Sequence, residues 1–464
     1  MFVDNVSRNA QRPLPQSDAF VDDSEQRHQI DSMLHGSMAE QQMKLLLICN
    51  ELGYRGTPRF CVNCAKIAKG AGHVVKIWAL DEGGSAADEC KANGISVSVG
   101  APHIDEMISF RPDIIHIHRG GGVSRRDNSI LSNLKKICGS RIIETNVFGI
   151  ADLTPHSPID VHAHISRWDL WRWRRWLWPL RRIGIYLPYC VDTDAIRPLP
   201  SGFRESHGIP LDAILIGRLG KTDWREISGA VVPAMEASSN IYFATVGDYS
   251  DDPSVTNAWP ENIRRRIVRI PALKGADELS AFYTACDATL NFSPIVESFG
   301  YVVAEAMACG TPCIAHSKPR NDNAQIEVAS TAAGGYPVRD AAAAQKTIME
   351  IAANPPDAKH RALCRKSIVD RYSSKNFAPK LLNAYSILSE TRGLDLEHKF
   401  RFAGFETEIP EHEICNALEN VIGGKPSLYD RLAMKLAYSL PNAVRIHRLA
   451  LRDLPSNPIN FSKQ

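Results

Sequence analysis

The sequence predicts an α/β fold made of two doubly wound, Rossmann-like domains in tandem. Short apolar runs typical of buried parallel strands recur along the chain, and glycine-containing loops and helical patterns separate them. The series stops after residues 185–188 and then starts again. Parallel sheets bind ligands at the carboxyl ends of their strands, so we expect the two domains to face a central cleft.

Length and composition are those of an ordinary globular protein. The 464 residues leave room for two cores and appendages, and 44% of them are hydrophobic and 23% charged. The formal net charge of +2 is too small to indicate a nucleic-acid partner. No run approaches the roughly 18 apolar residues of a membrane span. The polar, mildly acidic start is unlike a secretory signal, so we expect a cytoplasmic protein.

The cysteines point to a reducing compartment. There are eleven of them, an odd number, and many stand inside apolar runs, as Cys49 does. Cys61 and Cys64 have the CxxC spacing of a redox or zinc half-site. A second pair with metal spacing is missing from the sequence, and the segment has a helical pattern, so we favour packing in the core.

The first domain is predicted over 43–190. Before it, residues 1–42 are rich in Gln, Ser and Asp without a sustained apolar period, and we expect a disordered leader. The strands of this domain are expected at 44–48, 74–78, 94–99, 113–118 and 141–145. A helix should follow the first strand and end near Gly70 and Gly72.

The second domain is predicted over 191–375. Its strands are expected at 213–218, 242–247, 288–292 and 312–315. A helix over 376–395 should return toward the first domain. The remaining residues, 396–464, are predicted to be a helical extension with an amphipathic helix at 428–438.

The segment 293–312 carries the most chemistry. A strand ends just before it, and a loop then presents the carboxylate of Glu297. Gly300 allows close approach of the backbone to a ligand, and the helix that follows offers free N–H groups and a positive dipole end to a diphosphate. From that helix Glu305 could accept hydrogen bonds from a ribose, while Glu297 serves a sugar. Gly310 is expected to end the helix.

This segment resembles the signature of the family 4 retaining glycosyltransferases, which have the GT-B fold. Two glutamates with seven residues between them are followed by Ala-Met-Ala-Cys-Gly-Thr-Pro, with Ser-Pro and Phe-Gly alongside. A bare glutamate pair would equally suit an ordinary exposed helix. The resemblance spans about 43–390 and implies transfer of a sugar, with retention, from a nucleotide-diphosphate sugar to a glycan or lipid-linked acceptor held by the first domain. It implies no cofactor and no catalytic metal.

Two further segments resemble the same family. Arg218 stands in Gly-Arg-Leu, where the family's arginine holds the donor diphosphate, and a guanidinium fork suits phosphate. The second cation is either Lys221 or Arg225, because the spacing departs from the family's. Segment 186–194 resembles the stretch between the domains, although Tyr189 and Cys190 replace the usual Asn-Gly. Its Asp-Thr-Asp at 192–194 is expected to be a turn rather than a metal site.

Segment 112–118 resembles the family's strand that ends in His-x-His. His116 and His118 share one strand face, and the resemblance gives His118 to the donor sugar; the alternative is a core histidine. Gly56 is carried over from the family's first glycine-rich loop. The catalytic residues so implied are His118, Glu297 and Arg218. The donor-binding residues so implied are Gly56, Lys221, Arg225, Ser298, Phe299, Gly300, Tyr301 and Glu305.

Segment 167–182 is unusual, with five tryptophans and six arginines. If Trp171, Arg172, Arg175 and Trp178 face outward, the helix suits an anionic membrane surface. The alternative is a helix that packs one face on the first sheet. Arginine–tryptophan stacking would also suit nucleic acid, for which the fold pattern offers no support.

Other functions remain open on this fold. A nucleotide-sugar epimerase or a phosphorylase would share the architecture, although a phosphorylase would normally need a pyridoxal-phosphate lysine in a longer chain. A non-catalytic scaffold that binds a membrane or a partner is the alternative from another class. The intact Glu297, Glu305 and Arg218 argue for the enzyme.

Overall fold

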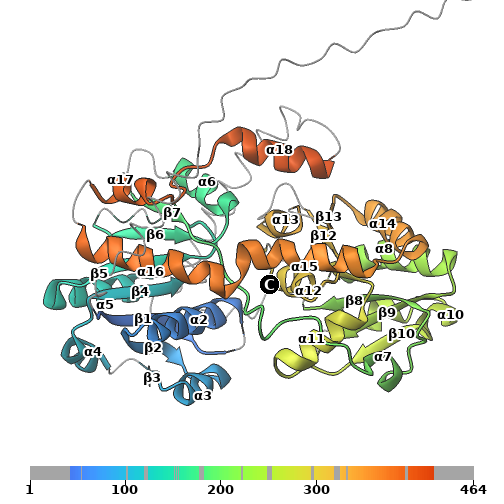
Figure 1. Ribbon diagram of the computed structural model, residues 1–464, viewed down its shortest axis with the longest axis horizontal. Coiled ribbons are helices and arrows are strands. Elements are labelled where there is room, and N and C mark those ends of the chain that lie inside the picture. Colours follow the sequence, from blue (N-terminus) through green and yellow to red (C-terminus); the bar gives the residue numbers. More distant parts are fainter. Residues whose placement is uncertain are drawn as a thin grey trace, which may run out of the picture. The chain divides into compact units, whose positions relative to one another are not determined.

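The computed structural model describes most of the chain between Gln42 and Ile422 (Figure 1). The described residues are 42–53, 55–100, 103–119, 124–150, 152, 154, 156–176, 182–220, 223–247, 253–293, 297–317, 324–330, 333–391 and 395–422. The predicted leader, apart from Gln42, and the predicted helix at 428–438 lie outside these residues.

The first sheet is parallel and has the order β3-β2-β1-β4-β5-β6-β7. Its strands are β1 (Lys44–Glu51), β2 (Val74–Glu82), β3 (Ser96–Val99), β4 (Ile114–Arg119), β5 (Arg141–Asn146), β6 (Val161–His164) and β7 (Gly184–Tyr186). The five strands predicted here are confirmed, and β6 and β7 are additional. The strand order reverses between β1 and β4, which is where doubly wound sheets bind ligands.

The second sheet is also parallel, in the order β10-β9-β8-β11-β12-β13, and reverses between β8 and β11. Its strands are β8 (Ile214–Leu219), β9 (Ile241–Val246), β10 (Ile267–Ile270), β11 (Ala288–Asn291), β12 (Cys313–His316) and β13 (Gly335–Val338). The four strands predicted here are confirmed. The two that were missed, β10 and β13, are short edge strands, and an edge tolerates the Pro337 that argues against a strand in the sequence.

Helices lie on both faces of each sheet (Figure 1). Those of the first sheet are α2 (Gly56–Gly70), α3 (Ser85–Ala92), α4 (Ile104–Phe110), α5 (Arg125–Cys138) and α6 (Arg167–Trp176). Those of the second are α7 (Phe203–Ser206), α8 (Trp224–Ala237), α9 (Pro253–Thr256), α10 (Glu261–Arg264), α11 (Gly275–Ala285), α12 (Tyr301–Ala308), α13 (Ala324–Ala329) and α14 (Ala341–Ala353). The last four are α15 (Ala358–Tyr372), α16 (Ser374–Glu390), α17 (Asp395–Phe402) and α18 (Glu411–Ile422). The α/β fold class predicted from the sequence is confirmed.

The chain crosses from one sheet's domain to the other near Val191 and again near Ser373, and these two crossings are hydrogen-bonded to each other. The Val191 N–H donates to the carbonyl of Tyr372 (2.7 Å), and the Ser374 N–H donates to the carbonyl of Val191 (3.0 Å). The Ser373 hydroxyl caps α16, which then packs on the first sheet. There the buried hydroxyl of Tyr385 lies 2.8 Å from Nδ1 of His116 in β4. Helix α16 therefore returns to the first sheet.

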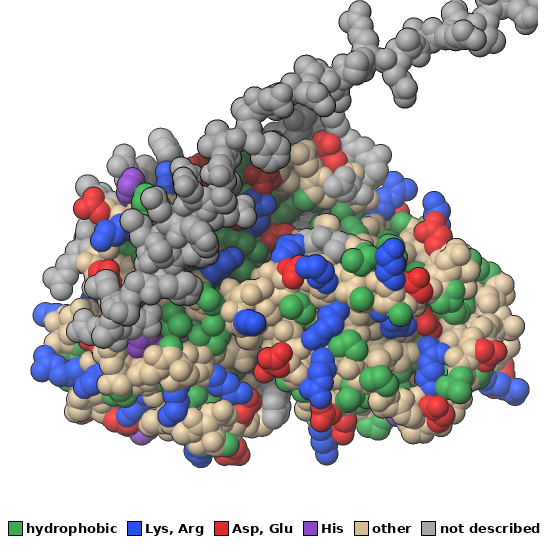
Figure 2. Space-filling view, viewed as in Figure 1, with side chains coloured by type: hydrophobic (Ala, Val, Ile, Leu, Met, Phe, Trp, Pro, Cys, Tyr) green, Lys and Arg blue, Asp and Glu red, His purple; other side chains and the backbone are tan. Residues whose placement is uncertain are grey.

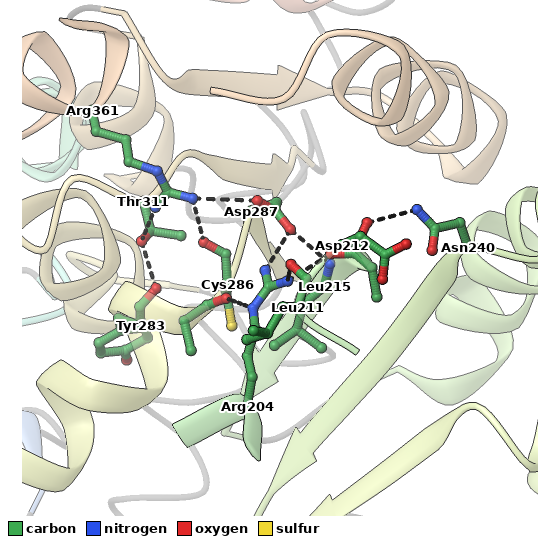
Figure 3. A network of polar contacts seen from close by, with 12 residues as sticks. Arg204, Leu211, Asp212, Leu215, Asn240, Tyr283, Cys286, Asp287, Thr311 and Arg361 are labelled. Atoms are coloured by element: carbon green, nitrogen blue, oxygen red, sulfur yellow. Dashed lines mark hydrogen bonds and ion pairs between the residues drawn. The ribbon is translucent and has the colours of Figure 1, made fainter. Parts of the chain in front are cut away.

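A polar network around Asp287 holds together the amino end of the second sheet (Figure 3). The Asp287 carboxylate precedes β11 and accepts the N–H of Leu215 in β8 at 2.8 Å. It also pairs with Arg204 of α7 at 2.8 Å and with Arg361 of α15 at 3.4 Å. Because this network lies at the amino end of β11, the carboxyl ends of the strands are left for other chemistry.

Helix α6 is buried, which corrects the prediction that Trp171 and Arg172 face outward. Trp171 is 5% exposed and Arg172 is 3% exposed, and Arg172 pairs with Asp169 at 2.9 Å. The apolar side of α6 packs against residues of α13, of α18 and of the segment before α18. The cluster is Trp168, Leu170, Trp171, Trp173, Ile326, Ile409, Ile414, Leu418 and Val421. The side chain of Arg175 and the whole of Trp178 lie outside the description.

Glutamates from one distant segment pair with two of the arginines of α6. Arg167 pairs with Glu406 and Glu413, each at 2.6 Å, and Arg174 pairs with Glu397 at 2.7 Å. All three glutamates belong to the C-terminal segment 395–422. The arginines therefore hold this segment against α6.

Both signs of charge occur on the surface that Figure 2 draws. On the side drawn in Figure 2, basic and acidic side chains are interspersed over the described surface. Among the helices of the described ranges, we find none with the length and apolarity required to cross a bilayer.

We predict that α6 contributes stability rather than vesicle binding. Replacing Trp171 with Ala should lower the free energy of unfolding by about 3–5 kcal/mol, because a large buried ring is lost. Denaturant unfolding measures this, and Phe402→Ala is the matched control. Phe402 is 88% exposed, and its loss should change the free energy by no more than about 0.5 kcal/mol. A Trp171→Ala variant of normal stability would contradict the buried position.

Candidate functional site

The candidate site lies where the strand order of the second sheet reverses. Arg218 stands in β8, and the loop that carries Glu297 follows the neighbouring strand β11. The loops after the two strands touch, because the N–H of Asp223 donates to the carbonyl of Phe292 at 3.0 Å. Helix α12 begins directly after the Glu297 loop. The two carboxylates and Arg218 thus come from adjacent parts of one sheet.

A glycine is required where α12 begins. Gly300 precedes the helix with φ of +90°, and a Cβ there would lie 3.0 Å from Cβ of Gln325 in α13. At the other end Gly310 has φ of +77°, and the N–H of Thr311 donates to the carbonyl of Ala306 at 3.0 Å. The helix predicted between the two glycines is confirmed. Its first turn has no acidic residue, so its free N–H groups can take an anion.

Glu297 is a carboxyl group with an altered pKa. Burial raises the pKa of Glu297 to about 7, and hydrogen bonds from Ser293 and Asn291 offset part of this increase. The side chain is thus neutral over part of the physiological range in the absence of a ligand. Ser298, the next residue, is half-buried.

Glu305 is buried and already paired. Its Oε1 accepts from Nη2 of Arg59 in α2 at 2.6 Å, and its Oε2 accepts from the hydroxyl of Tyr283 at 3.4 Å. The carboxylate of Glu305 raises the pKa of Arg59 above its ordinary value, so Arg59 stays charged. The guanidinium lies 5.0 Å from the centre of the Tyr301 ring. A ribose at Glu305 would have to displace Arg59.

The basic residues differ in exposure. Arg218 is buried, donates from Nη1 to the Thr245 hydroxyl at 2.9 Å and lies 5.3 Å from the Trp224 ring centre. Burial lowers the pKa of Arg218 to about 10, which leaves it charged at neutral pH. Arg225 is exposed in the first turn of α8. Lys221 lies outside the described residues, so the choice between Lys221 and Arg225 stays open.

Aromatic rings fill the junction between α2 and α12. The ring centre of Tyr189 lies 5.3 Å from that of Tyr301 and 5.6 Å from that of Phe299. A Cβ on Gly56 would lie 3.3 Å from the Tyr301 ring, so the first loop of the first sheet adjoins the start of α12. The departure at Tyr189 therefore places a ring against the start of α12, where the resemblance implies Asn-Gly.

His118 is buried in a cluster of possible metal ligands. The centre of its ring lies 4.0 Å from that of His116, and neither ring nitrogen of His118 has a hydrogen-bond partner among the described residues. Burial lowers the pKa of both histidines, to about 3 for His116. Donor atoms of Cys64, His116 and His118 lie within 4.8 Å of one another. Both nitrogens of His116 already contact hydroxyls, of Tyr385 and of Thr145.

The structure places two further sequence patterns. Cys61 and Cys64 are fully buried on α2, and both belong to the main core. Asp192 accepts the N–H groups of Asp194 and Ala195 at 3.2 and 3.1 Å. The prediction of a turn at this Asp-Thr-Asp is thereby confirmed.

The sequence analysis missed Arg59. A signal was present, because a cation in the first turn of a helix opposes the helix dipole and no acidic residue of that turn offsets it. An arginine at this position predicts an anionic partner nearby that offsets the unfavourable interaction with the helix dipole. The identity of its partner, 246 residues away, came only from the fold.

Comparison with known proteins agrees with this arrangement. Residues 211–354, which run from the loop before β8 through α14, match the family described as Glycosyl transferases group 1. No curated protein sequence matches the chain.

Solved structures of glycosyltransferases share the fold. A glycosyltransferase from Rickettsia africae is 19% identical, with a TM-score of 0.59 over 76% of this chain and 100% of that one. HepE from Anabaena, solved with UDP and glucose, is 14% identical, with a TM-score of 0.56 over 74% and 100%. Sucrose-phosphate synthase from Thermosynechococcus elongatus is 16% identical, with a TM-score of 0.55 over 75% and 99%. The two sheets therefore have the GT-B arrangement.

We predict that Glu297 lowers the stability of the folded protein at high pH. Its folded pKa, about 7, exceeds the ordinary 4.5, so its stabilising contribution is complete at low pH and is lost as pH rises from 4.5 to 7. Glu297→Gln should therefore melt at a higher temperature than the unmodified protein at pH 8, with little difference at pH 5.

Thermal melts at both pH values measure this difference. Glu205→Gln, at an exposed glutamate of α7, is the control for the same chemical change. A gain for Glu297→Gln that is equal at pH 5 and pH 8 would contradict the prediction.

Proposed function

We propose that the protein is a retaining glycosyltransferase that moves a sugar from a nucleotide-diphosphate sugar to a glycan or lipid-linked acceptor. The observation that carries this proposal is the pair Glu297 and Glu305 around the start of α12, beside Arg218. The pair lies within the region that matches the glycosyltransferase family.

The leaving diphosphate meets a set of preorganised positive groups. The free N–H groups of α12, the buried guanidinium of Arg218, and Lys221 or Arg225 stabilise the charge that develops as the glycosidic bond breaks. Glu297 accepts hydrogen bonds from the sugar, and Glu305 accepts them from the ribose. His118 orients the sugar from the first sheet.

Retention follows from the face of attack. The acceptor oxygen forms its bond to the anomeric carbon on the face that the nucleoside diphosphate leaves, and the acceptor's proton leaves with the phosphate. Protein cations and helix amides are the partners of the diphosphate, so catalysis needs no divalent ion.

UDP is the nucleotide to test first, because HepE was solved with UDP and with UDP-glucose. The acceptor is held by the domain 43–190, in the cytoplasm. Docking to an anionic membrane through 167–182 is not part of this proposal, because Trp171 and Arg172 are buried.

A second candidate is a non-catalytic scaffold that kept the fold. The ion pair of Glu305 with Arg59 and the ring of Tyr189 beside α12 favour it, since both occupy positions that a donor needs. Binding of nucleotides separates the two candidates, because a scaffold of this kind would bind none.

We predict that Glu297→Ala and Arg218→Ala lose most turnover. Loss of one preorganised contact to the transition state typically lowers the rate about 10²–10³-fold. Consumption of UDP-glucose and other nucleotide sugars by purified protein measures this, and circular dichroism verifies the fold. Glu205→Ala is the exposed control. Near-normal turnover in both site variants would overturn the assignment.

We also predict that turnover persists in EDTA, because no step uses a divalent ion. The comparison is the rate before and after dialysis against the chelator. Strict dependence on magnesium or manganese would contradict the proposal and would turn attention to Asp192 and Asp194.

A further inference from the structure

Arg59, near the start of α2, connects that helix to α12. It is the fourth residue of α2, and its Nη2 lies 2.6 Å from Oε1 of Glu305 in α12. The Glu305 side chain is only 3% exposed, whereas that of Arg59 is 34% exposed. The guanidinium therefore reaches solvent on one side while it neutralises a buried carboxylate on the other.

The starts of α2 and α12 adjoin at this contact, because Gly56 at the start of α2 lies next to the ring of Tyr301 at the start of α12. The first turns of both helices contain no acidic residue, so their N–H groups are not offset within the turn. In the free protein the charge of Arg59 is balanced by Glu305. A ligand that replaced Arg59 on Glu305 would leave the guanidinium and the helix N–H groups available to an anion with more than one charged group.

The spacing along α12 identifies which part of a ligand would meet Arg59. Glu305 comes four residues after Tyr301, which is about 6 Å along a helix axis. Arg59 contacts Glu305 and lies 5.0 Å from the ring centre of Tyr301, so it touches side chains of both the first and the fifth residue of α12. A nucleoside diphosphate with its ribose at Glu305 and its phosphates at the first amides of α12 would pass the guanidinium.

We propose that Arg59 is a further donor-binding residue, paired with Glu305 in the free protein and transferred to the donor diphosphate when ribose hydroxyls take its place on that carboxylate. This inference rests on the proposed function. The exchange is non-covalent: ribose O–H groups donate to Glu305, and guanidinium N–H groups donate to phosphate oxygens. Arg59 remains protonated throughout, and the Tyr301 ring can contact the guanidinium in both states.

The alternative is an ion pair that only ties α2 to α12. The two roles predict different effects of removing Arg59 on the affinities for a nucleoside and for its diphosphate. A structural tie would change the binding of both ligands equally or of neither. Loss of a residue that binds the diphosphate weakens only the binding of the phosphorylated ligand.

The test is titration calorimetry with UDP and uridine, using the full-length protein and Arg59→Gln. We expect the Kd of UDP to rise about 10- to 100-fold, as for a lost charge-assisted hydrogen bond. The Kd of uridine should stay the same or fall, because Glu305 is released for the ribose. GDP with guanosine, and ADP with adenosine, replace this pair if UDP does not bind. Equal changes for diphosphate and nucleoside, or no change, would overturn the inference.

Arg55→Gln is the matched control. It removes the same charge one turn earlier on the same chain, but Arg55 is 80% exposed and pairs with Glu51. Its effect on UDP affinity should stay within about twofold, as for a screened surface pair. If Arg55→Gln loses as much affinity for UDP as Arg59→Gln does, the effect comes from the lost positive charge in general. That result would contradict a direct contact between Arg59 and the diphosphate.

A second comparison is needed if the Arg59→Gln protein unfolds because Glu305 is left as an unpaired buried charge. Glu305→Gln is then compared with the double variant Arg59→Gln, Glu305→Gln, in which two neutral amides can still pair. The double variant should bind UDP about 10- to 100-fold more weakly than Glu305→Gln and bind uridine equally well. Equal UDP affinity would overturn the inference. If the unmodified protein binds none of the diphosphates, both the proposed function and the inference about Arg59 fail.

Discussion

The buried carboxylate of Glu305 constrains the whole arrangement around α12. A carboxylate removed from water must be neutralised by a cation or strong donors, and the second sheet offers it only the hydroxyl of Tyr283 among the contacts described. The cation comes from the first sheet, through Arg59. Helix α2 must therefore lie against α12, which also brings Gly56 to the ring of Tyr301. The charge balance of Glu305 in the second sheet's domain thus depends on a side chain of the first.

Aromatic rings line one side of this junction. The ring of Tyr301 lies against the Arg59 guanidinium, and Tyr189 and Phe299 pack against Tyr301. An apolar wall on that side strengthens the ion pair, while Arg59, whose side chain is 34% exposed, reaches solvent on another side. Tyr189, which stands where the resemblance implies Asn, extends this wall.

The arginine and tryptophan content of α6 has a structural reason. Its rings pack with α13 and α18, and Arg167 and Arg174 pair with glutamates of the segment 395–422. Glu327 of α13 accepts the first two N–H groups of α6, from Arg167 and Trp168, at 3.1 and 2.7 Å. A helix rich in surface-type residues becomes a buried connector when oppositely charged segments cover it.

The sequence alone determined the fold class, nine of the thirteen strands in the described part of the chain and the helix between Gly300 and Gly310, because period and glycine placement act locally. The missed strands β6 and β10 have four residues each, and histidine or arginine side chains interrupt them, so no continuous apolar run marks them. The orientation of α6 and the partner of Glu305 were decided only by the tertiary structure. Arg59 and Glu305 are 246 residues apart, and whether a charged side chain meets solvent or a counter-charge depends on what packs over it.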